Sequence, residues 1–216
     1  MDKHFLNCSP QKNFADVYVA EIPHNVIIEE VLPNERNEQI KKASCERVKA
    51  EKYFVWRLLE HAISKSLGLT VVDAEFFCDQ NGKWRSPRCE FSISHTTSAV
   101  AVIISHVPVG IDIEEADRVI SPSFAKRFLT ADEFSEYSLV SDNKKNAFLL
   151  TRWCMKEAIF KKLDGKAFAP SKVSSKSENA FDKRIFLGEK EYVIAISCED
   201  MDKVRIFAVQ TENLPI

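Results

Sequence analysis

The stretch SAVAVIISHVPVGIDIEEADR, residues 98–118, joins two runs of β-branched residues through a short connection that contains proline. The first run predicts a buried strand, and the second predicts another strand that carries Asp112 and Glu114. Side chains two positions apart in a strand lie on the same face, so these two carboxylates are neighbours. Neighbouring carboxylates repel each other unless a positive group lies near them. The stretch therefore marks both a junction in the fold and a candidate site.

Further secondary structure is predicted on both sides of this stretch. The residues that predict strands are 14–22, 70–79, 89–95 and three runs within 183–210, and an Asn-Gly turn is expected within 80–84. The residues that predict helices are 44–67, which end at Gly68, and the two segments 121–140 and 143–165. Residues 171–183 predict a surface loop. The strands at 89–95, 98–105 and 109–115 follow one another so closely that an antiparallel meander is expected.

The order of these elements is strand, helix, strands, helices and strands again, which favours an α+β fold. Two similar halves that join near residues 106–110 fit this order. We therefore expect an N-terminal half of residues 1–107 and a C-terminal half of residues 108–216.

The composition excludes several classes of protein. The chain has 216 residues, 45% of them hydrophobic, and a net charge of −2, which argues against a strongly basic nucleic-acid-binding protein. It contains no apolar run long enough to span a membrane and no apolar segment near its start that resembles a signal peptide. Its six cysteines are scattered and predict reduced thiols. A cytoplasmic protein without membrane or nucleic-acid partners is expected.

Asp112 and Glu114 allow two interpretations. They are either the charged outer face of an edge strand or ligands of a divalent cation, because Mg²⁺ prefers oxygen ligands and commonly takes one or two carboxylates with phosphate oxygens. Gly110, just before them, would let a ligand or another backbone approach the strand closely.

The segment RWCMKEAIFKK, residues 152–162, also allows two interpretations. If this face of the predicted helix is solvated, Glu157 simply pairs with Lys161 one turn later. In the functional interpretation, Glu157 is a third carboxylate on the metal and Lys156 binds a phosphate.

Other polar groups are either ordinary surface residues or phosphate contacts, and the residues alone do not decide between these. They are Ser94 and His95 at the end of the strand 89–95, Lys83 after the Asn-Gly turn, and Arg47 and Arg57 on the first long helix.

Taken together and in this order, four motifs resemble those of the 4′-phosphopantetheinyl transferases of the surfactin-synthetase-activating type. They are GKW at 82–84, FSISH at 91–95, GIDIE at 110–114 and WCMKEAIFK at 153–161. Trp84 departs from the G-K-P of the family, and Ala167 departs from its later G-x-G. The resemblance implies two similar α/β halves with pseudo-twofold symmetry and a cleft between them that binds coenzyme A as co-substrate.

The resemblance also implies a metal site in that cleft. Asp112, Glu114 and Glu157 are expected to hold Mg²⁺, or Mn²⁺ in its place, against the pyrophosphate of coenzyme A. Lys156 is expected to contact the same pyrophosphate and stabilise its charge, and Glu157 is expected to act as ligand, as base for the serine proton, or as both. Alanine at Asp112 or Glu157 is expected to abolish transfer with little loss of folding.

The remaining contacts to coenzyme A follow from the same resemblance. Ser94 and His95 are expected at the 3′-phosphate, Lys83 is expected close to the same phosphates, and Arg47 is expected to reach the nucleotide.

The implied reaction moves the 4′-phosphopantetheine arm of coenzyme A to a serine of an apo acyl, peptidyl or polyketide carrier protein and releases 3′,5′-ADP. A monomer is expected, since one chain supplies both halves. Positively charged residues are expected to receive an acidic helix of the carrier: Lys126, Arg127, Lys144 and Lys145, with Phe124 and Phe128 nearby. The alternatives are a catalytically silent module that binds coenzyme A or a carrier, and a Mg²⁺-dependent pyrophosphohydrolase.

Overall fold

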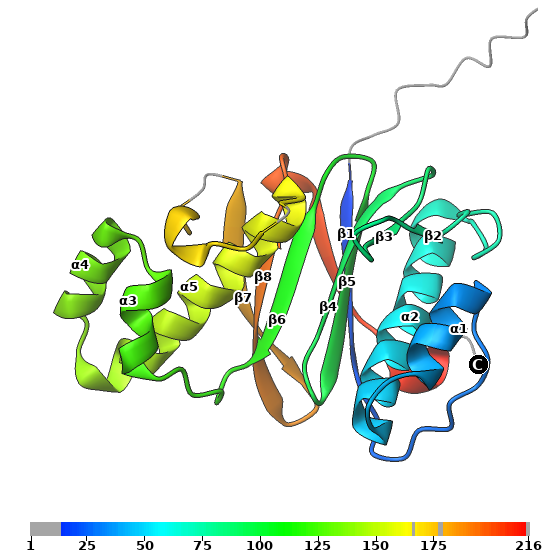
Figure 1. Ribbon diagram of the computed structural model, residues 1–216, viewed down its shortest axis with the longest axis horizontal. Helices are drawn as coiled ribbons and strands as arrows, with labels where there is room; N and C mark the ends of the chain where they lie inside the picture. The colour runs from blue at the N-terminus through cyan, green and yellow to red at the C-terminus, as the bar shows by residue number, and fades with distance from the viewer. Residues whose placement is uncertain (1–13, 166, 177–178, 215–216) are drawn as a thin grey trace, which may run out of the picture.

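The computed structural model describes residues 14–165, 167–176 and 179–214, and Figure 1 labels its helices and strands. The helices are α1 (Asn34–Lys41), α2 (Glu46–Leu67), α3 (Ala125–Phe128), α4 (Ala131–Leu139) and α5 (Asp142–Leu163). The strands are β1 (Ala15–Glu21), β2 (Phe77–Cys78), β3 (Trp84–Arg85), β4 (Glu90–His95), β5 (Ala99–Ser105), β6 (Gly110–Glu115), β7 (Ala180–Leu187), β8 (Lys190–Ser197) and β9 (Val204–Ala208). None of the described helices is both long and apolar enough to cross a membrane.

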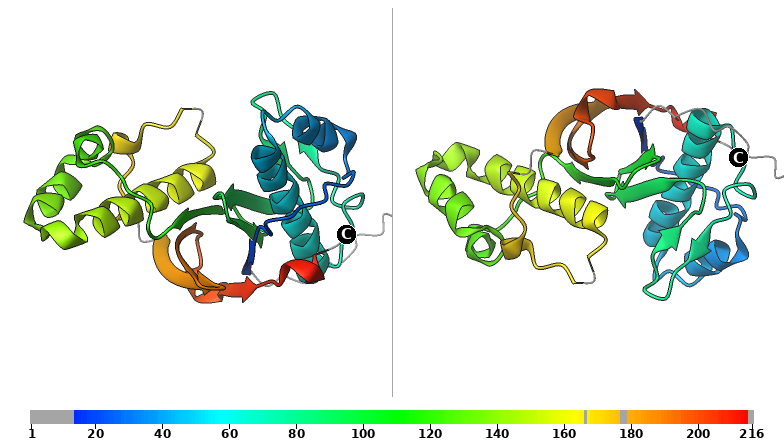
Figure 2. Two further views of the ribbon diagram at one scale, coloured as in Figure 1. Left: turned by 90° about the horizontal axis from the view of Figure 1, so that it is seen from below. Right: turned by 90° about the horizontal axis from the view of Figure 1, so that it is seen from above.

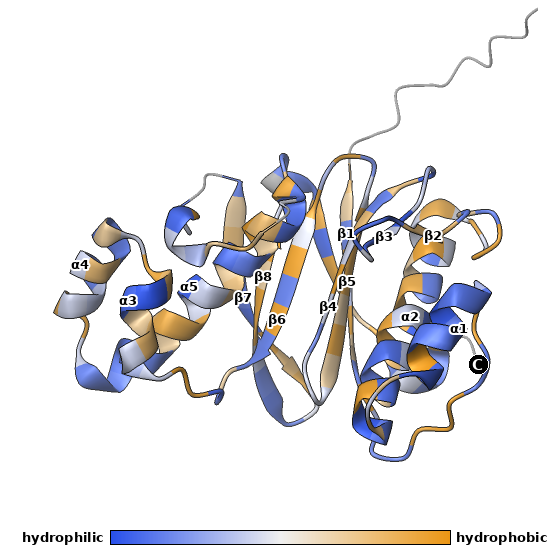
Figure 3. Ribbon diagram, viewed as in Figure 1, coloured by the Kyte–Doolittle hydropathy of each residue, from blue (hydrophilic) through white to orange (hydrophobic). Residues whose placement is uncertain are grey.

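Two sheets pack against each other between two long helices. The first sheet has the strand order β4-β5-β1-β9 and the second has the order β6-β8-β7, while β2 and β3 pair separately. In Figure 1 the layers run from α5 through the second sheet and the first sheet to α2, and Figure 3 shows apolar residues concentrated on the inner strands. The expected α+β class is confirmed, and each sheet carries one helix of 22 residues on its outer face.

The strand alternation sorts side chains between these layers. Val17 and Val19 of β1 face the second sheet, whereas Tyr18 and Ala20 face α2. In β6, Ile111 and Ile113 face the first sheet, which turns Asp112 and Glu114 toward the layer of α5. The apolar residues between the carboxylates thus orient the whole acidic face.

The expected meander of three strands is wrong for its third strand. β4 and β5 are antiparallel neighbours, but β6 leaves this sheet and pairs with β8 instead. Side chains link the two sheets where no ladder forms: the hydroxyl oxygens of Ser92 and Ser94 accept hydrogen bonds from the backbone N–H groups of Ile111 (3.2 Å) and Ile113 (3.4 Å). β6 is therefore close to β4 but has an acidic face that is free to meet α5.

The predicted strand over residues 70–79 is largely wrong, because only β2 is extended there. The Thr70 hydroxyl donates a 2.6 Å hydrogen bond to Asp73, and this local bond favours a turn over a strand. The Asn-Gly turn is confirmed, with Gly82 at a φ of +80°. The predicted loop over residues 171–183 is also too long, since β7 begins at Ala180.

The chain does not divide cleanly after residue 107. β9 returns to the first sheet and pairs in parallel with β1, and Leu214 lies in the core beneath α2. An ion pair reinforces this return, because Arg205 of β9 donates a 2.7 Å hydrogen bond to the buried Asp16 of β1. The C-terminal segment thus belongs structurally to the first half, a correction to the boundaries expected from the sequence.

Gly110 lets α5 lie directly on β6. A Cβ atom at this position would lie 1.9 Å from the carbonyl oxygen of Ala158 and 2.7 Å from the backbone nitrogen of Lys162. Ala158 follows Glu157, so this close approach also brings the acidic residue of α5 to the acidic strand. Neither of the two contacted atoms belongs to a flexible side chain that could move aside.

We expect Gly110→Ala to lower the free energy of unfolding by about 3 kcal/mol or more, because the helix backbone must shift. Gly82→Ala is the matched control: its Cβ would meet open space, and only the positive φ opposes it, at a cost of about 1 kcal/mol. Denaturant-induced unfolding of both variants measures the difference. Equal losses in the two variants would show that α5 does not require the glycine.

Candidate active site

A pocket of about 410 Å³ lies between the two halves and is lined by residues from both. It brings together five of the residues predicted from the sequence, namely Ser94, His95, Asp112, Glu114 and Glu157. Three positively charged residues line the same pocket: Arg36 of α1, Lys52 of α2 and Lys161 of α5. Carboxylates and cations therefore meet in one place at the junction of the halves.

Asp112 is the most buried of the three acidic residues. Its Oδ1 accepts hydrogen bonds from the Lys161 ammonium (2.8 Å) and from the Ser94 hydroxyl (2.7 Å). Its Oδ2 is buried and has no hydrogen-bond partner among the described residues. A buried carboxylate oxygen without a partner is costly, and a cation is the kind of ligand that would stabilise it.

The other two carboxylates have shifted pKa values. Burial raises the pKa of Glu157 to about 7, and repulsion from Asp112 adds to this rise. Burial also raises the pKa of Glu114, although a hydrogen bond from Arg118 opposes it. Both residues are thus destabilised in their charged form, which a bound cation would reverse.

Positively charged side chains of the chain itself partly neutralise the carboxylates of Asp112 and Glu114 in β6. Lys161 pairs with Asp112, and Arg118 pairs with Glu114. Among the described residues no group of three or more His, Cys, Asp or Glu side chains is arranged closely enough to hold a metal ion. Mg²⁺ needs only one or two carboxylates in addition to phosphate oxygens and water, and the unpartnered Asp112 oxygen with Glu157 beside it fits that requirement.

Lys156 does not line this pocket. It is fully buried, and its ammonium lies 2.6 Å from the carboxylate of Glu133 in α4. Successive residues of a helix point about 100° apart, so Glu157 faces β6 while Lys156 faces α4. This placement corrects the expected phosphate contact of Lys156.

Lys161 is the lysine of α5 that reaches the acidic strand. It lies one helical turn after Glu157, and its ammonium reaches Asp112, Ser94 and the carbonyl oxygen of Ile111. Burial lowers the pKa of Lys161, but the attraction of Asp112 outweighs burial and leaves the pKa raised. The spacing of four residues between Glu157 and Lys161 is visible in the sequence, but it is as typical of an exposed ion pair on a helix as of two groups in one site.

Arg36 and Lys52 had no motif to mark them. The Arg36 guanidinium lies over the Trp56 ring, 5.0 Å from its centroid, and donates a 2.6 Å hydrogen bond to the carbonyl oxygen of Lys52. Burial lowers the pKa of Arg36 to about 10, and its Nε has no partner among the described residues.

His95 and Arg47 share a carboxylate at the edge of the site. His95 Nδ1 lies 3.5 Å from one oxygen of Glu51, and Arg47 lies 2.9 Å from the other. Burial lowers the pKa of His95, and Glu51 opposes that shift only in part. Arg47 lines an adjoining pocket and not the one that contains Asp112. Arg57 lines neither of these two pockets and forms an ion pair with Glu60.

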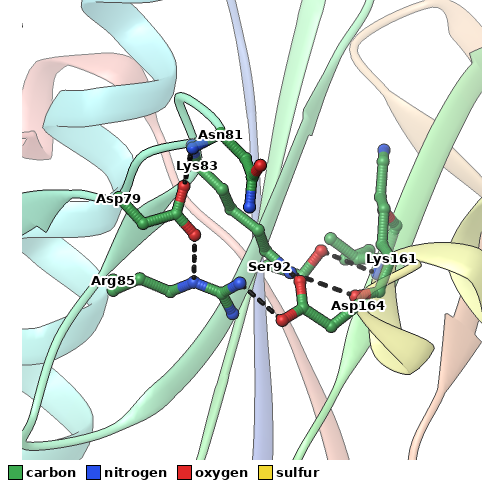
Figure 4. A network of polar contacts seen from close by, with 8 residues as sticks. Asp79, Asn81, Lys83, Arg85, Ser92, Lys161 and Asp164 are labelled. Carbon is green, nitrogen blue, oxygen red and sulfur yellow. Dashed lines mark hydrogen bonds and ion pairs between the residues drawn. The ribbon is translucent and has the colours of Figure 1, made fainter. Parts of the chain in front are cut away.

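Lys83 joins the two halves instead of lining the pocket. Figure 4 shows its ammonium and the Arg85 guanidinium meeting the carboxylate of Asp164, at the end of α5, with Asp79 on the other side of Arg85. Lys83 is 2.8 Å and Arg85 2.5 Å from the two Asp164 oxygens. Trp84 lies between Lys83 and Arg85 in the sequence and is buried against Trp56. The tryptophan that replaces the proline of the family's G-K-P motif is therefore part of the hydrophobic core.

Asp164 ends α5 in the left-handed region, at a φ of 55°. We expect Asp164→Gly to change the free energy of unfolding by no more than about 1 kcal/mol, because glycine relieves the backbone strain while the half-exposed ion pairs contribute little. Asp164→Ala should cost about 1 to 2 kcal/mol more than Asp164→Gly, because alanine keeps the backbone strain that glycine relieves. Urea unfolding of the two variants tests this, and identical stabilities would refute it.

Comparisons with known proteins show what this chain is similar to. Residues 108–206 match a model of the 4′-phosphopantetheinyl transferase superfamily. A holo-[acyl-carrier-protein] synthase from Mycoplasma mobile is 39% identical over 107 residues, which are 49% of this chain and 90% of that protein. The 4′-phosphopantetheinyl transferase psf-1 of Bacillus pumilus is 34% identical over 115 residues, 52% of this chain and 48% of that protein.

Two further matches cover 52% and 42% of this chain. The 4′-phosphopantetheinyl transferase Sfp of Bacillus subtilis is 30% identical over 115 residues, so the chain spans about half the length of this relative and of psf-1. A solved holo-[acyl-carrier-protein] synthase from Thermotoga maritima aligns at 20% identity over 42% of this chain and 62% of that chain, with a TM-score of 0.29, too low to establish a common fold. The match that covers nine-tenths of the Mycoplasma protein decides the assignment. This chain belongs to the 4′-phosphopantetheinyl transferase superfamily.

Proposed function

We propose that the chain transfers the 4′-phosphopantetheine arm of coenzyme A to a serine of an apo acyl, peptidyl or polyketide carrier protein. One observation carries the proposal: a single pocket between the halves holds three carboxylates, one with an unpartnered oxygen, beside three cations. This combination suits a pyrophosphate that is bound together with a divalent cation. Both walls come from one chain, which supports a monomer as the active form.

Asp112 and Glu157 would hold the Mg²⁺ of this reaction together with phosphate oxygens, and Glu114 would move closer to join them. When bound, the cation neutralises charge that develops on the pyrophosphate oxygens and orients the leaving group. Arg118 must then share Glu114 with the cation, since the two residues are paired in the structure.

Lys161 supplies the second positive charge at the pyrophosphate. Its ammonium lines the pocket and donates its three protons to Ser94, Asp112 and the carbonyl oxygen of Ile111, so it must exchange one of these partners for a phosphate oxygen. Arg36, Lys52 and His95 line the same pocket and would bind the remaining phosphate of the nucleotide.

Glu157 is the group placed to take the proton of the carrier serine. Glu157 lines the pocket beside Asp112, where its carboxylate is available to accept the proton of a serine hydroxyl that reaches the pyrophosphate. The serine oxygen forms a bond to the β-phosphorus of coenzyme A, the bond from that phosphorus to the bridging oxygen breaks, and 3′,5′-ADP leaves with that oxygen.

The carrier would approach α3, where Lys126 and Arg127 are exposed next to the partly buried Phe124. Phe128 was expected to contribute to this surface, but it is fully buried in the core under α5. Lys144 and Lys145 lie at the start of α5, where Lys145 pairs with Asp142.

Chromatography of the nucleotide products tests the proposal. Coenzyme A and Mg²⁺ should yield 3′,5′-ADP only when an apo carrier protein is added. Cleavage without a carrier would favour a pyrophosphohydrolase, and coenzyme A binding without cleavage would favour a silent binding module.

A further inference from the structure

Lys156 and Glu133 form a buried ion pair outside the pocket. Their side chains are 0% and 1% exposed, and the Lys156 ammonium lies 2.6 Å from Glu133 Oε2. The ammonium also donates hydrogen bonds to the carbonyl oxygens of Pro170 (2.9 Å) and Val173 (2.5 Å). All three of its protons therefore have acceptors, and none points toward the site of chemistry.

The Glu133 carboxylate is equally saturated. Its Oε1 accepts hydrogen bonds from the backbone N–H (2.8 Å) and the hydroxyl (2.5 Å) of Ser175, and its Oε2 accepts one from the backbone N–H of Thr130 (2.8 Å). Burial alone would raise the pKa of Glu133, but the bonds from Lys156 and Ser175 outweigh it and lower the pKa to about 2. The carboxylate is thus charged across the whole physiological range.

The pair joins three parts of the chain that share no sheet. Lys156 belongs to α5, Glu133 lies in the first turn of α4, and residues 170–175 form the segment that both side chains bind. The single turn of 3₁₀ helix at residues 170–172 packs in turn against α3. Figure 2 shows α3 and α4 at the end of the molecule farthest from α2, and contacts with α5 and this segment help to position them.

We propose that Lys156 and Glu133 are positioning residues that hold α3, α4 and residues 170–175 as a rigid platform for the carrier protein. The inference rests on the proposed function. In this proposal Lys156 does not contact coenzyme A. Its neighbour on α5, Glu157, faces the reacting atoms, so the helix connects the platform to the site. Loss of the pair should therefore misplace the carrier serine and leave the coenzyme A pocket intact.

A buried ion pair is an unusual way to gain stability. Removal of one partner leaves an uncompensated charge and is strongly destabilising, whereas replacement of both by apolar residues is often neutral. The pair here also binds Ser175 and the two carbonyl groups, which apolar residues cannot do. An experiment can therefore separate the effect of the pair on the free energy of unfolding from its effect on the position of residues 170–175.

The test compares Lys156→Met, Glu133→Gln and the double variant Lys156→Met with Glu133→Leu. Lys162→Met, on the same helix but half-exposed, is the control. Urea midpoints are measured together with kcat and the KM values for coenzyme A and for an apo carrier. Both single variants should lose stability and raise the KM for the carrier about tenfold, while the KM for coenzyme A changes less than twofold.

The double variant decides whether the pair acts through position. We expect it to regain at least half of the lost stability while its KM for the carrier stays raised, because the bonds to residues 170–175 are still missing. A double variant that regains both would overturn the inference. So would a Lys156→Met variant that raises the KM for coenzyme A while Glu133→Gln leaves it unchanged, since that result places Lys156 on a phosphate. A parent chain without transfer activity would instead refute the proposed function.

Discussion

Glu157→Gln is expected to lower the rate of phosphopantetheine transfer at least about 100-fold without loss of the fold. The amide cannot take the proton of the serine, and it is a poorer ligand for Mg²⁺ than a carboxylate. The buried carboxylate is itself destabilising, as its raised pKa shows, so its removal should leave the metal-free protein as stable or more stable. Transfer rates at saturating coenzyme A and urea unfolding in EDTA measure the two effects.

The pH dependence of stability checks the same residue independently of activity. In the unfolded chain this carboxyl ionises near 4.5, whereas in the folded protein it stays protonated up to about 7. The folded state binds more protons in this window, so Glu157 makes the protein lose stability as the pH rises from 4.5 to 7. In EDTA the Glu157→Gln variant should show a smaller loss over that range. Parallel curves for the two proteins would mean that Glu157 is not desolvated.

Asp112→Asn is expected to be as inactive as Glu157→Gln but, unlike it, to be less stable than the parent chain. Asparagine keeps the shape of the side chain and removes the charge that holds Lys161 and would hold Mg²⁺. The uncompensated ammonium should cost about 1 to 3 kcal/mol in the free energy of unfolding. We therefore expect little loss of folding for the Glu157 variant but a measurable loss for the Asp112 variant, because Asp112 forms an ion pair with Lys161 in the structure.

A double variant separates the two roles of Asp112. Asp112→Asn combined with Lys161→Met removes both charges, and its stability should return toward that of the parent chain while transfer stays absent. Urea midpoints and transfer assays on the single and double variants supply the comparison. Appreciable transfer by Asp112→Asn would contradict the assignment of Asp112 as a metal ligand.

The sequence predicted the two faces of β6 better than the sheets around it. The alternation of Ile111 and Ile113 with Asp112 and Glu114 determines which face is apolar, and the structure follows it. The same alternation says nothing about which strand becomes the neighbour, so the departure of β6 from the meander and the return of β9 to β1 could not be foreseen. Those pairings depend on contacts between residues far apart in the chain.

Lys156 and Lys161 of α5 show most clearly what the sequence alone could not predict. Lys156 and Lys161 both lie within a turn or so of Glu157, and motif order alone favoured Lys156. Which lysine meets the acidic strand depends on the rotation of α5 on β6, and this rotation is set by the contact of its backbone with Gly110. The rotation turns Lys161 to Asp112 and leaves Lys156 to Glu133.

The most direct test of the central claim is the intact mass of a carrier protein after incubation with this chain. An apo acyl carrier protein and an apo peptidyl carrier protein would each be mixed with the chain, coenzyme A and Mg²⁺, and parallel samples would contain EDTA or the Glu157→Gln variant. Our account predicts that at least one carrier gains the mass of one phosphopantetheine arm, and that this gain disappears with EDTA and with the variant. Carriers of unchanged mass, despite coenzyme A bound to the chain, would contradict it.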